Sequence, residues 1–401
     1  MRVDDLLDLK ERTKSKDNGV YEKAQFELNV VFQKILNGQF GVRIAVIFCF
    51  LFPQYVPALA ESILDPVAHL EADLDDKEWF QYLPMFLRLF SAQLEPRYVS
   101  RALDRIAYGN PATLYLAFAT LDPANQLVNA TKVARYLSAM GNKYYLAKFF
   151  FYWRRILGYT DHAEMNKLFF YQFNLTEEWL DEWMEGMRRE SRERIAEYKA
   201  MADAAGRPLL SPDSAIIKDR PGTTSPKFIV LHSAGAGSPV ERICANFLAP
   251  DSTVTAHFVV SVDGRIFQLV DLKDAAKTNR TDNNPDMDTY YRFAGHDFFR
   301  QCGNNANNFT ITIECEEFGA HGALSPGQYY KVLYLLKKIN EEYGIPIDEY
   351  HVIGHRDIAP LTRGFCPGSS FPLQKLIQVF PTWRKEVELL SARILSPAEL
   401  I

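Results

Sequence analysis

Two short stretches decide the fold of the last third of the chain: KFIVLHSAGAG at Lys227–Gly237 and VIGHRDIAPLTRGFCPG at Val352–Gly368. Each begins with an apolar run typical of a buried strand and reaches a histidine, His232 in the first and His355 in the second. Cys366 follows in the loop after His355. Two imidazoles and a thiolate suit a catalytic zinc, which takes three protein ligands and keeps one position open. We therefore expect Zn²⁺ to be bound by these three residues.

The motifs between these stretches narrow the function. Thr255–Val270 reads as a strand hairpin across an Asp-Gly turn, and Asn307–Gly319 reads as a strand that carries Glu314. The order is strand with His, hairpin, strand with Glu, helix, strand with His, loop with Cys. It resembles the zinc-dependent N-acetylmuramoyl-L-alanine amidases, the type 2 amidase and peptidoglycan-recognition-protein superfamily. The resemblance covers Pro221–Trp383 and leaves the first half of the chain untouched.

The resemblance assigns roles to named residues. His232 matches the first zinc ligand, and His355, within Gly-His-Arg-Asp-Ile-Ala-Pro, matches the second. Cys366 matches the third, which is Asp in other branches of the family. Glu314 matches the catalytic glutamate, whose role would be general base toward water at the metal. Glu316 and Glu317 follow at once, so the choice among three carboxylates rests on the resemblance.

Four further positions are candidate site residues. Arg363 lies near the place of a family lysine that stabilises the oxyanion, although the loop here is one residue longer than the usual spacing. His257 is expected beside the site, as a support for a ligand or a substrate contact, and not on the metal. Lys277 and Asn279 replace the family's groove-lining segment and are expected to line the substrate groove.

The chain is expected to be an α+β protein of two domains. Helical spacing of apolar residues dominates residues 1–204, which predicts an all-α domain that serves delivery, docking or targeting. Residues 205–226 are rich in Pro, Gly and Ser and predict a linker. A mixed β-sheet flanked by helices is expected at 227–390 as the zinc amidase domain, and 391–401 as a C-terminal tail.

The helices expected in the first domain are separated by short loops that contain Pro, Gly, Asp or Asn. Asp122-Pro123-Ala124-Asn125 is taken as one such loop. After a first helix that stops near Asn37-Gly38, the expected helices are Phe40–Phe52, Val56–Leu70, Asp76–Gln93, Pro96–Tyr108, Pro111–Thr120, Ala130–Gly141, Lys143–Gly158 and Thr176–Ala204.

Composition excludes several classes of partner and location. The net charge of −5 over 401 residues gives no reason to expect nucleic-acid binding. The N-terminus lacks the apolar core of a signal peptide, and the apolar run Ile44–Phe52 is too short to span a bilayer, so stable membrane insertion is not expected. Five cysteines without paired spacing indicate synthesis in a reducing compartment. The expected location is the cytoplasm, with action on the cell wall after lysis or specialised delivery; a purely cytoplasmic role is the alternative.

The predicted function is hydrolysis of the amide between N-acetylmuramic acid and L-alanine in peptidoglycan. The enzyme would be bacteriolytic, either similar to a phage endolysin or a secreted antibacterial effector. The alternative is a peptidoglycan-binding recognition module without catalysis. An immunity protein, a chaperone or a secretion system would be a partner of the helical domain. A zinc-stabilised scaffold is a third interpretation, and no motif supports it.

Overall fold

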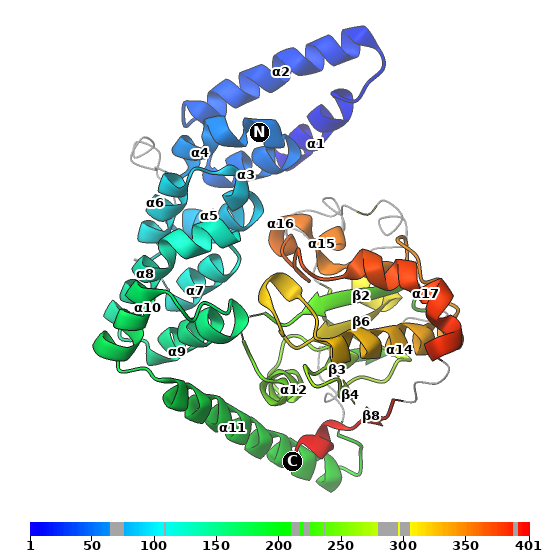
Figure 1. Ribbon diagram of the computed structural model, residues 1–401. Coiled ribbons are helices and arrows are strands. Elements are labelled where there is room, and N and C mark those ends of the chain that lie inside the picture. Colours follow the sequence, from blue (N-terminus) through cyan, green and yellow to red (C-terminus); the bar gives the residue numbers. More distant parts are fainter. Residues whose placement is uncertain are drawn as a thin grey trace. The chain divides into compact units, whose positions relative to one another are not determined.

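The computed structural model describes residues 1–64, 76–107, 110–209, 217–219, 225–235, 237–279, 296, 305–387 and 392–401. These residues form two compact units. The first comprises Met1–Phe149 with Ala163–Leu168, and the second comprises Phe150–His162 with Phe169–Ile401 (Figure 1). Most of residues 281–303 and the end of the predicted helix Val56–Leu70 lie outside the described residues.

The first unit is helical, as the sequence predicted. Apolar residues at helical spacing bury one face of most of its helices, and α3 is buried nearly all round. Its longer helices are α1 (Val3–Arg12), α2 (Asn18–Leu36), α3 (Val42–Leu51), α4 (Val56–Leu64), α5 (Asp76–Phe90), α6 (Pro96–Ile106), α7 (Pro111–Ala119), α8 (Pro123–Ala139) and α9 (Lys143–Phe151).

Helix α8 starts earlier than predicted. Asp122 and Pro123 were read as part of a loop, but the Asp122 carboxylate accepts hydrogen bonds from the backbone N–H groups of Ala124 and Asn125. Proline is favoured at the first helical position because its missing N–H would have no partner there. The Asp-Pro pair is therefore a helix start, and the helix begins at Pro123. The sequence analysis also missed the short helix α10 (Ala163–Asn166).

Within the described ranges, no single helix combines the length and apolar character needed to cross a membrane. Val42–Leu51 and Pro53–Leu64 meet that test only as a pair, and the pair is bent by 118°.

The second unit contains a mixed six-stranded sheet in the order β7-β2-β6-β3-β4-β8. Parallel pairs join β7 to β2, β2 to β6, β6 to β3 and β4 to β8, while β3 and β4 form the predicted antiparallel hairpin. This arrangement confirms the predicted fold class. The strands are β2 (Phe228–Ser233), β3 (Phe258–Val260), β4 (Ile266–Gln268), β6 (Thr310–Cys315), β7 (Val352–Gly354) and β8 (Ile394–Leu395); β1 (Ile217–Asp219) pairs separately with β5 (Asp274–Ala276).

Alternation along β6 divides its side chains between two environments. Ile311, Ile313 and Cys315 enter the hydrophobic core beneath α14 (Pro326–Tyr343) and α17 (Leu373–Val387). Because successive strand residues point to opposite faces, Thr310, Thr312 and Glu314 share the other face. On β2, Ile229 and Leu231 join the same core, so His232 lies on the face of Glu314. His232, Thr310, Thr312 and Glu314 therefore collect on one side of the sheet.

Helix α11 (Glu177–Ala204) belongs to the second unit. Its residues Ile195 and Ala202 share a buried cluster with α12 (Val240–Leu248) and with Leu400. A Cβ atom on Gly237 would lie 2.4 Å from a ring carbon of Phe151, so the loop after β2 rests directly on that ring. The main segment of the first unit thus ends at Phe149, while the all-α domain expected from the sequence ends at residue 204. The last residues, expected as a tail, add β8 to the sheet edge.

Two loops touch through their backbones next to the predicted cysteine ligand. A Cβ atom on Gly322 would lie 1.8 Å from the carbonyl oxygen of Pro367, and one on Gly368 would lie 1.9 Å from that of His321. Gly322 and Gly368 have φ angles of 82° and 117°, a region that favours glycine. The Ser370 N–H also donates to the carbonyl of His321 at 2.9 Å. This contact holds the segment that carries Cys366.

The backbone contact predicts that Gly322→Ala loses much more stability than Gly344→Ala. Gly344 ends α14 with φ of 68° and open space at its Cβ position, so Gly344→Ala should cost only the backbone term, about 1–2 kcal/mol. Gly322→Ala adds a backbone clash and should cost about 2–5 kcal/mol. Melting temperatures should fall by about 2–4 °C per kcal/mol. Equal losses for the two variants would contradict the close contact.

Candidate metal centre and active site

Three predicted ligands meet at one end of the sheet. Atoms of His232, His355 and Cys366 that could bind a metal lie within 4.8 Å of one another, and all three residues are buried. His232 is on β2, His355 begins the short helix α15 (His355–Ile358) after β7, and Cys366 is in the loop after α16 (Pro360–Arg363). β7 and β6 flank β2 in parallel, so their carboxyl ends lie at the same edge. The sheet topology brings the three side chains together.

Backbone contacts hold the cysteine loop against α15. The Arg356 N–H donates to the carbonyl of Cys366 at 2.8 Å, and the Arg356 guanidinium donates to the carbonyl of Gly368 at 3.2 Å. A Cβ on Gly354 would lie 2.7 Å from the Pro367 ring, so glycine permits this approach. The Asp357 carboxylate accepts from the Gly354 N–H at 2.7 Å and caps α15. The Gly-His-Arg-Asp motif therefore places one ligand and fixes the loop of another.

The donor set fits zinc. In a tetrahedral zinc site with bonds of about 2.1 Å to nitrogen and about 2.3 Å to sulfur, those two ligand atoms lie about 3.6 Å apart. Cys366 Sγ lies 3.6 Å from His232 Nδ1. The rings of His232 and His355 have centroids 4.5 Å apart, which leaves both within reach of the same point. Two imidazoles and a thiol are also the ligand types of catalytic zinc sites with an open position.

Burial favours the neutral forms of His232 and Cys366 in the protein alone. It lowers the pKa of His232 to about 4, an effect that the hydrogen bond to Asn279 opposes. Burial also raises the pKa of the Cys366 thiol to about 12, and the nearby Glu314 carboxylate adds to this rise. Neutral imidazole is the form that binds a metal, whereas the thiol must lose its proton when a metal binds.

Glu314 lies beside the cluster, and the charge of Arg363 acts on both. Glu314 pairs with His232 in the strand register, and its carboxylate oxygen lies 4.0 Å from His232 Nδ1. Burial raises the pKa of Glu314 to about 8, and the Arg363 guanidinium opposes that shift. The same guanidinium lowers the pKa of His232 and of Cys366, so it is electrostatically close to all three groups. Arg363 is half-buried at the end of α16 (Pro360–Arg363).

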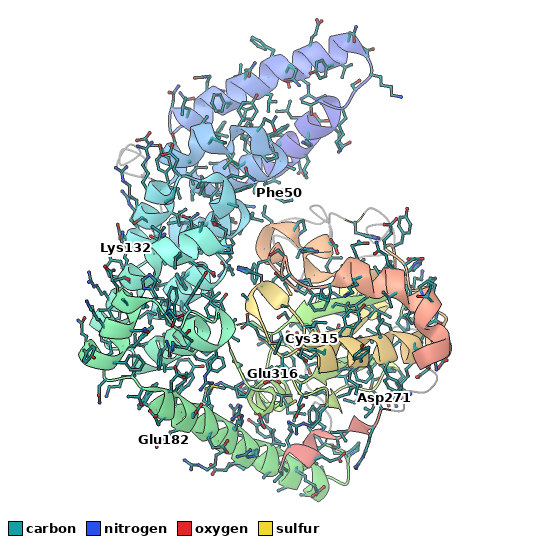
Figure 2. The ribbon with its side chains drawn as sticks, in the orientation of Figure 1. Phe50, Lys132, Glu182, Asp271, Cys315 and Glu316 are labelled. Carbon is teal, nitrogen blue, oxygen red and sulfur yellow. The ribbon has the colours of Figure 1, made fainter. Side chains whose placement is uncertain are left out.

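The other two glutamates of the Glu-rich stretch have backbone partners. The Glu316 carboxylate accepts from the Val240 N–H at 3.0 Å, at the start of α12, and from the Val262 N–H at 2.8 Å. Glu317 accepts from the Gly237 N–H at 2.8 Å. Glu316 follows Cys315 at the end of β6 (Figure 2). Of the three glutamates, Glu314 is the one that the structure places beside the metal ligands.

His257 is fully buried. Its Nδ1 accepts from the Thr312 N–H at 3.0 Å, and its Nε2 lies 3.1 Å from the carbonyl of Asp274. Because Nδ1 accepts, Nε2 carries the proton and donates to that carbonyl. These contacts join the residue before β3 to β6 and β5. The structure thus gives His257 backbone partners and no exposed surface for a substrate.

The side chains of Lys277 and Asn279 differ in their exposure to solvent. The Lys277 side chain is exposed, while its carbonyl accepts from the Thr255 N–H at 3.2 Å. Asn279 is buried, and its side-chain oxygen lies 2.9 Å from His232 Nε2. The sequence analysis expected both to line a groove, and it missed the Asn279 partners Thr310 and Thr312. The spacing of these threonines two and four positions before Glu314 on one strand face was the available signal.

Comparison with known proteins agrees with the predicted family and its C-terminal position. Residues 222–369 match the family model Amidase_2, described as N-acetylmuramoyl-L-alanine amidase, and this segment is an Amidase_2 domain. It contains the three candidate ligands and Glu314. No curated protein matches the chain.

Several solved structures are similar to part of the chain. An AmpD derivative is 21% identical with a TM-score of 0.33, covering 43% of this chain and 93% of its own. A mutant endolysin from Bacillus subtilis is 22% identical with a TM-score of 0.28, covering 45% and 96%. N-acetylmuramoyl-L-alanine amidase LysC from Clostridium intestinale URNW is 15% identical with a TM-score of 0.29, covering 43% and 96%.

The metal cluster predicts one zinc ion per chain. Cys366→Ala should abolish stoichiometric zinc, measured by mass spectrometry of the metal, while Cys244→Ala, another buried cysteine on α12, should retain it. Free zinc at 100 times its dissociation constant should stabilise the wild type by about 2.7 kcal/mol. A chelator should therefore lower the melting temperature of the wild type but not of Cys366→Ala. Zinc retained by Cys366→Ala would rule out this ligand set.

Glu316 is predicted to stabilise the fold. Glu316→Ala leaves the N–H groups of Val240 and Val262 without this acceptor, at a cost of about 1–3 kcal/mol for each group that stays buried. Glu341→Ala on α14, whose partner Lys337 lies 3.7 Å away, should change stability by less than about 1 kcal/mol. Thermal melting should separate the two variants. Equal melting temperatures would show that water replaces the Glu316 carboxylate.

Proposed function

We propose that the second unit is a zinc-dependent N-acetylmuramoyl-L-alanine amidase, which hydrolyses the amide between N-acetylmuramic acid and L-alanine in peptidoglycan. One observation carries the proposal: the His232, His355 and Cys366 cluster lies beside a buried carboxyl, Glu314, inside the segment that matches the amidase family. A recognition module that only binds peptidoglycan has no need for a buried carboxyl at its metal ligands. The cell-wall lytic role and the delivery role of the helical unit stay predictions from the sequence.

His232, His355 and Cys366 would hold the ion at the edge of the sheet where the parallel strands end. Zinc, when bound, supplies Lewis-acid chemistry: it polarises a carbonyl and lowers the pKa of water. Two neutral imidazoles and one thiolate leave the bound ion with a net charge of about +1, since only Cys366 contributes a negative charge. The positive charge would favour the anionic oxygen that develops when an amide is attacked.

Glu314 is proposed to move protons. Its carboxylate lies 4.0 Å from His232 Nδ1, so water at the ligands would lie within hydrogen-bond reach of it. Once a bound cation favours its ionised form, Glu314 would take a proton from the attacking water and deliver it to the amine of L-alanine that leaves. Burial removes competing solvent from this exchange, because the side chain is 8% exposed.

Arg363 is proposed to stabilise the negative oxygen. Its guanidinium is close enough to affect the pKa of Glu314 and of Cys366, and its side chain is only half-buried. A guanidinium keeps its charge at every working pH and offers several donors. Hydrogen bonds aimed at a developing oxyanion act mainly in the transition state. Arg363 would therefore raise kcat more than it tightens substrate binding.

Digestion of purified peptidoglycan by the zinc-loaded protein tests the proposal. Wild type should release intact stem peptides with free L-alanine amino ends, identified by mass spectrometry. Glu314→Gln should lower the rate by about 10²–10⁴-fold, the usual contribution of general acid–base catalysis. Glu342→Gln, the same change on the exposed face of α14, should match wild type.

Two outcomes would reject the proposal. If the zinc-loaded wild type binds the polymer but releases no peptide, the protein is a recognition module. If Glu314→Gln cuts as fast as the wild type, proton transfer depends on another group.

A further inference from the structure

A chain of buried hydrogen bonds ends at Nε2 of His232, the ring nitrogen that is not the one near Cys366. Asn279 Oδ1 lies 2.9 Å from His232 Nε2, and Asn279 Nδ2 lies 2.7 Å from Thr310 Oγ1 and 3.2 Å from Thr312 Oγ1. Asn279, Thr310 and Thr312 are each at most 2% exposed. Polar groups buried to this extent need defined partners, so the direction of each bond can be followed through the network.

The donor and acceptor of each hydrogen bond in this network can be assigned from a backbone carbonyl onward. The Thr310 hydroxyl donates to the carbonyl of Ala306 at 3.0 Å, which uses its only proton. Its oxygen must then accept from Asn279, and only the amide NH₂ of Asn279 can donate. The NH₂ group therefore faces the two threonines and the amide oxygen faces His232. This sets the orientation of the Asn279 amide.

The amide orientation in turn sets the tautomer of His232. An amide oxygen only accepts, so His232 Nε2 carries the proton and donates it. In a neutral imidazole the other nitrogen, Nδ1, then has the free lone pair. Nδ1 is the nitrogen that lies 3.6 Å from Cys366 Sγ and 4.0 Å from the Glu314 carboxylate. The lone pair thus points into the ligand cluster.

We infer that Asn279 is a positioning residue that makes His232 bind the metal through Nδ1. The inference rests on the zinc site of the proposed function. It assigns Asn279 to contact with Nε2 of the ligand His232, and not to the substrate groove. Hydrogen bonds of this kind, from the second nitrogen of a ligating histidine, orient the ring and raise its basicity.

Asn279 is itself held in place from the start of β6. Its backbone N–H donates to Asn307 Oδ1 at 2.9 Å, and the N–H of Thr278 donates to the same oxygen at 3.0 Å. Asn307 belongs to the short helix Ala306–Phe309, immediately before β6. The backbone and the side chain of Asn279 are thus both tied to the strand that carries Glu314. One segment of chain therefore positions a ligand relative to the proposed base.

Substitution of Asn279 by residues of similar size tests the inference. Asn279→Leu keeps the number and branching of the side-chain heavy atoms but removes the acceptor, and it should weaken zinc binding about 10–100-fold, measured by competition with a chromophoric chelator. Asn279→Asp keeps an acceptor for His232 Nε2 and should retain most of the affinity. Lys277→Ala changes an exposed side chain on the same segment and should leave the affinity unchanged. Circular dichroism of the metal-free proteins checks that all variants fold.

Nitrogen-15 NMR of the zinc-loaded full chain supplies a second readout. The wild type should show His232 bound through Nδ1, with an Nε2 proton that exchanges slowly with solvent. In Asn279→Leu that exchange should become faster, which loss of a merely structural contact elsewhere would not cause.

The outcomes separate the two proposals. Binding of zinc through His232 Nε2, or equal zinc affinity of Asn279→Leu and wild type, would overturn the inference and leave the amidase proposal standing. If a wild type that binds zinc as inferred, with affinity reduced in Asn279→Leu, cuts no peptidoglycan, the amidase proposal fails and the inference stands. Absence of any zinc binding by wild type would overturn both.

Discussion

The parallel register between β2 and β6 is the constraint on which the candidate site depends. It sets His232 opposite Glu314, and both side chains share the face that Thr310 and Thr312 also occupy. A slip of one residue would turn either strand over and send its polar residues into the core beneath α14 and α17. The alternate residues Ile311 and Ile313 prevent that slip, because their burial stabilises only the observed register. Hydrophobic burial on one face therefore fixes the chemistry on the other.

The site concentrates ionisable groups where solvent cannot stabilise their charges. Burial favours the neutral forms of His232, Glu314 and Cys366. A cation at the cluster would reverse this preference for the thiol, because a bound metal supplies the positive charge that water does not. Arg363 contributes a fixed positive charge that acts on the same groups. This electrostatic design matches a site that must hold a metal and develop negative charge during a reaction.

Local patterns predicted much of the fold and the residues that meet as candidate ligands. The hairpin of β3 and β4 follows from an Asp-Gly turn, and the candidate ligands follow from strand ends and a Gly-His-Arg-Asp motif. The contacts of Asn279 with His232 and of Glu316 with Val240 could not be predicted this way. Their partners lie 47 and 76 residues away along the chain, and neither contact leaves a mark on the local sequence. The closeness of Gly322 to Pro367 has the same character: it depends on how two loops meet.

The family match ends at an earlier residue than the folded unit does. The match ends at residue 369, but β8, at residues 394–395, pairs with β4 at the edge of the sheet, and Leu400 fills a cluster with α11 and α12. A protein cut to the matched segment would lose both, and the backbone of β4 would be left as an open edge. Open edges pair with strands of other molecules, which is how sheets begin to aggregate. The short β8 therefore shields the backbone of β4 from strands of other molecules. Insolubility of a trimmed protein would reflect an exposed edge rather than a defective active site.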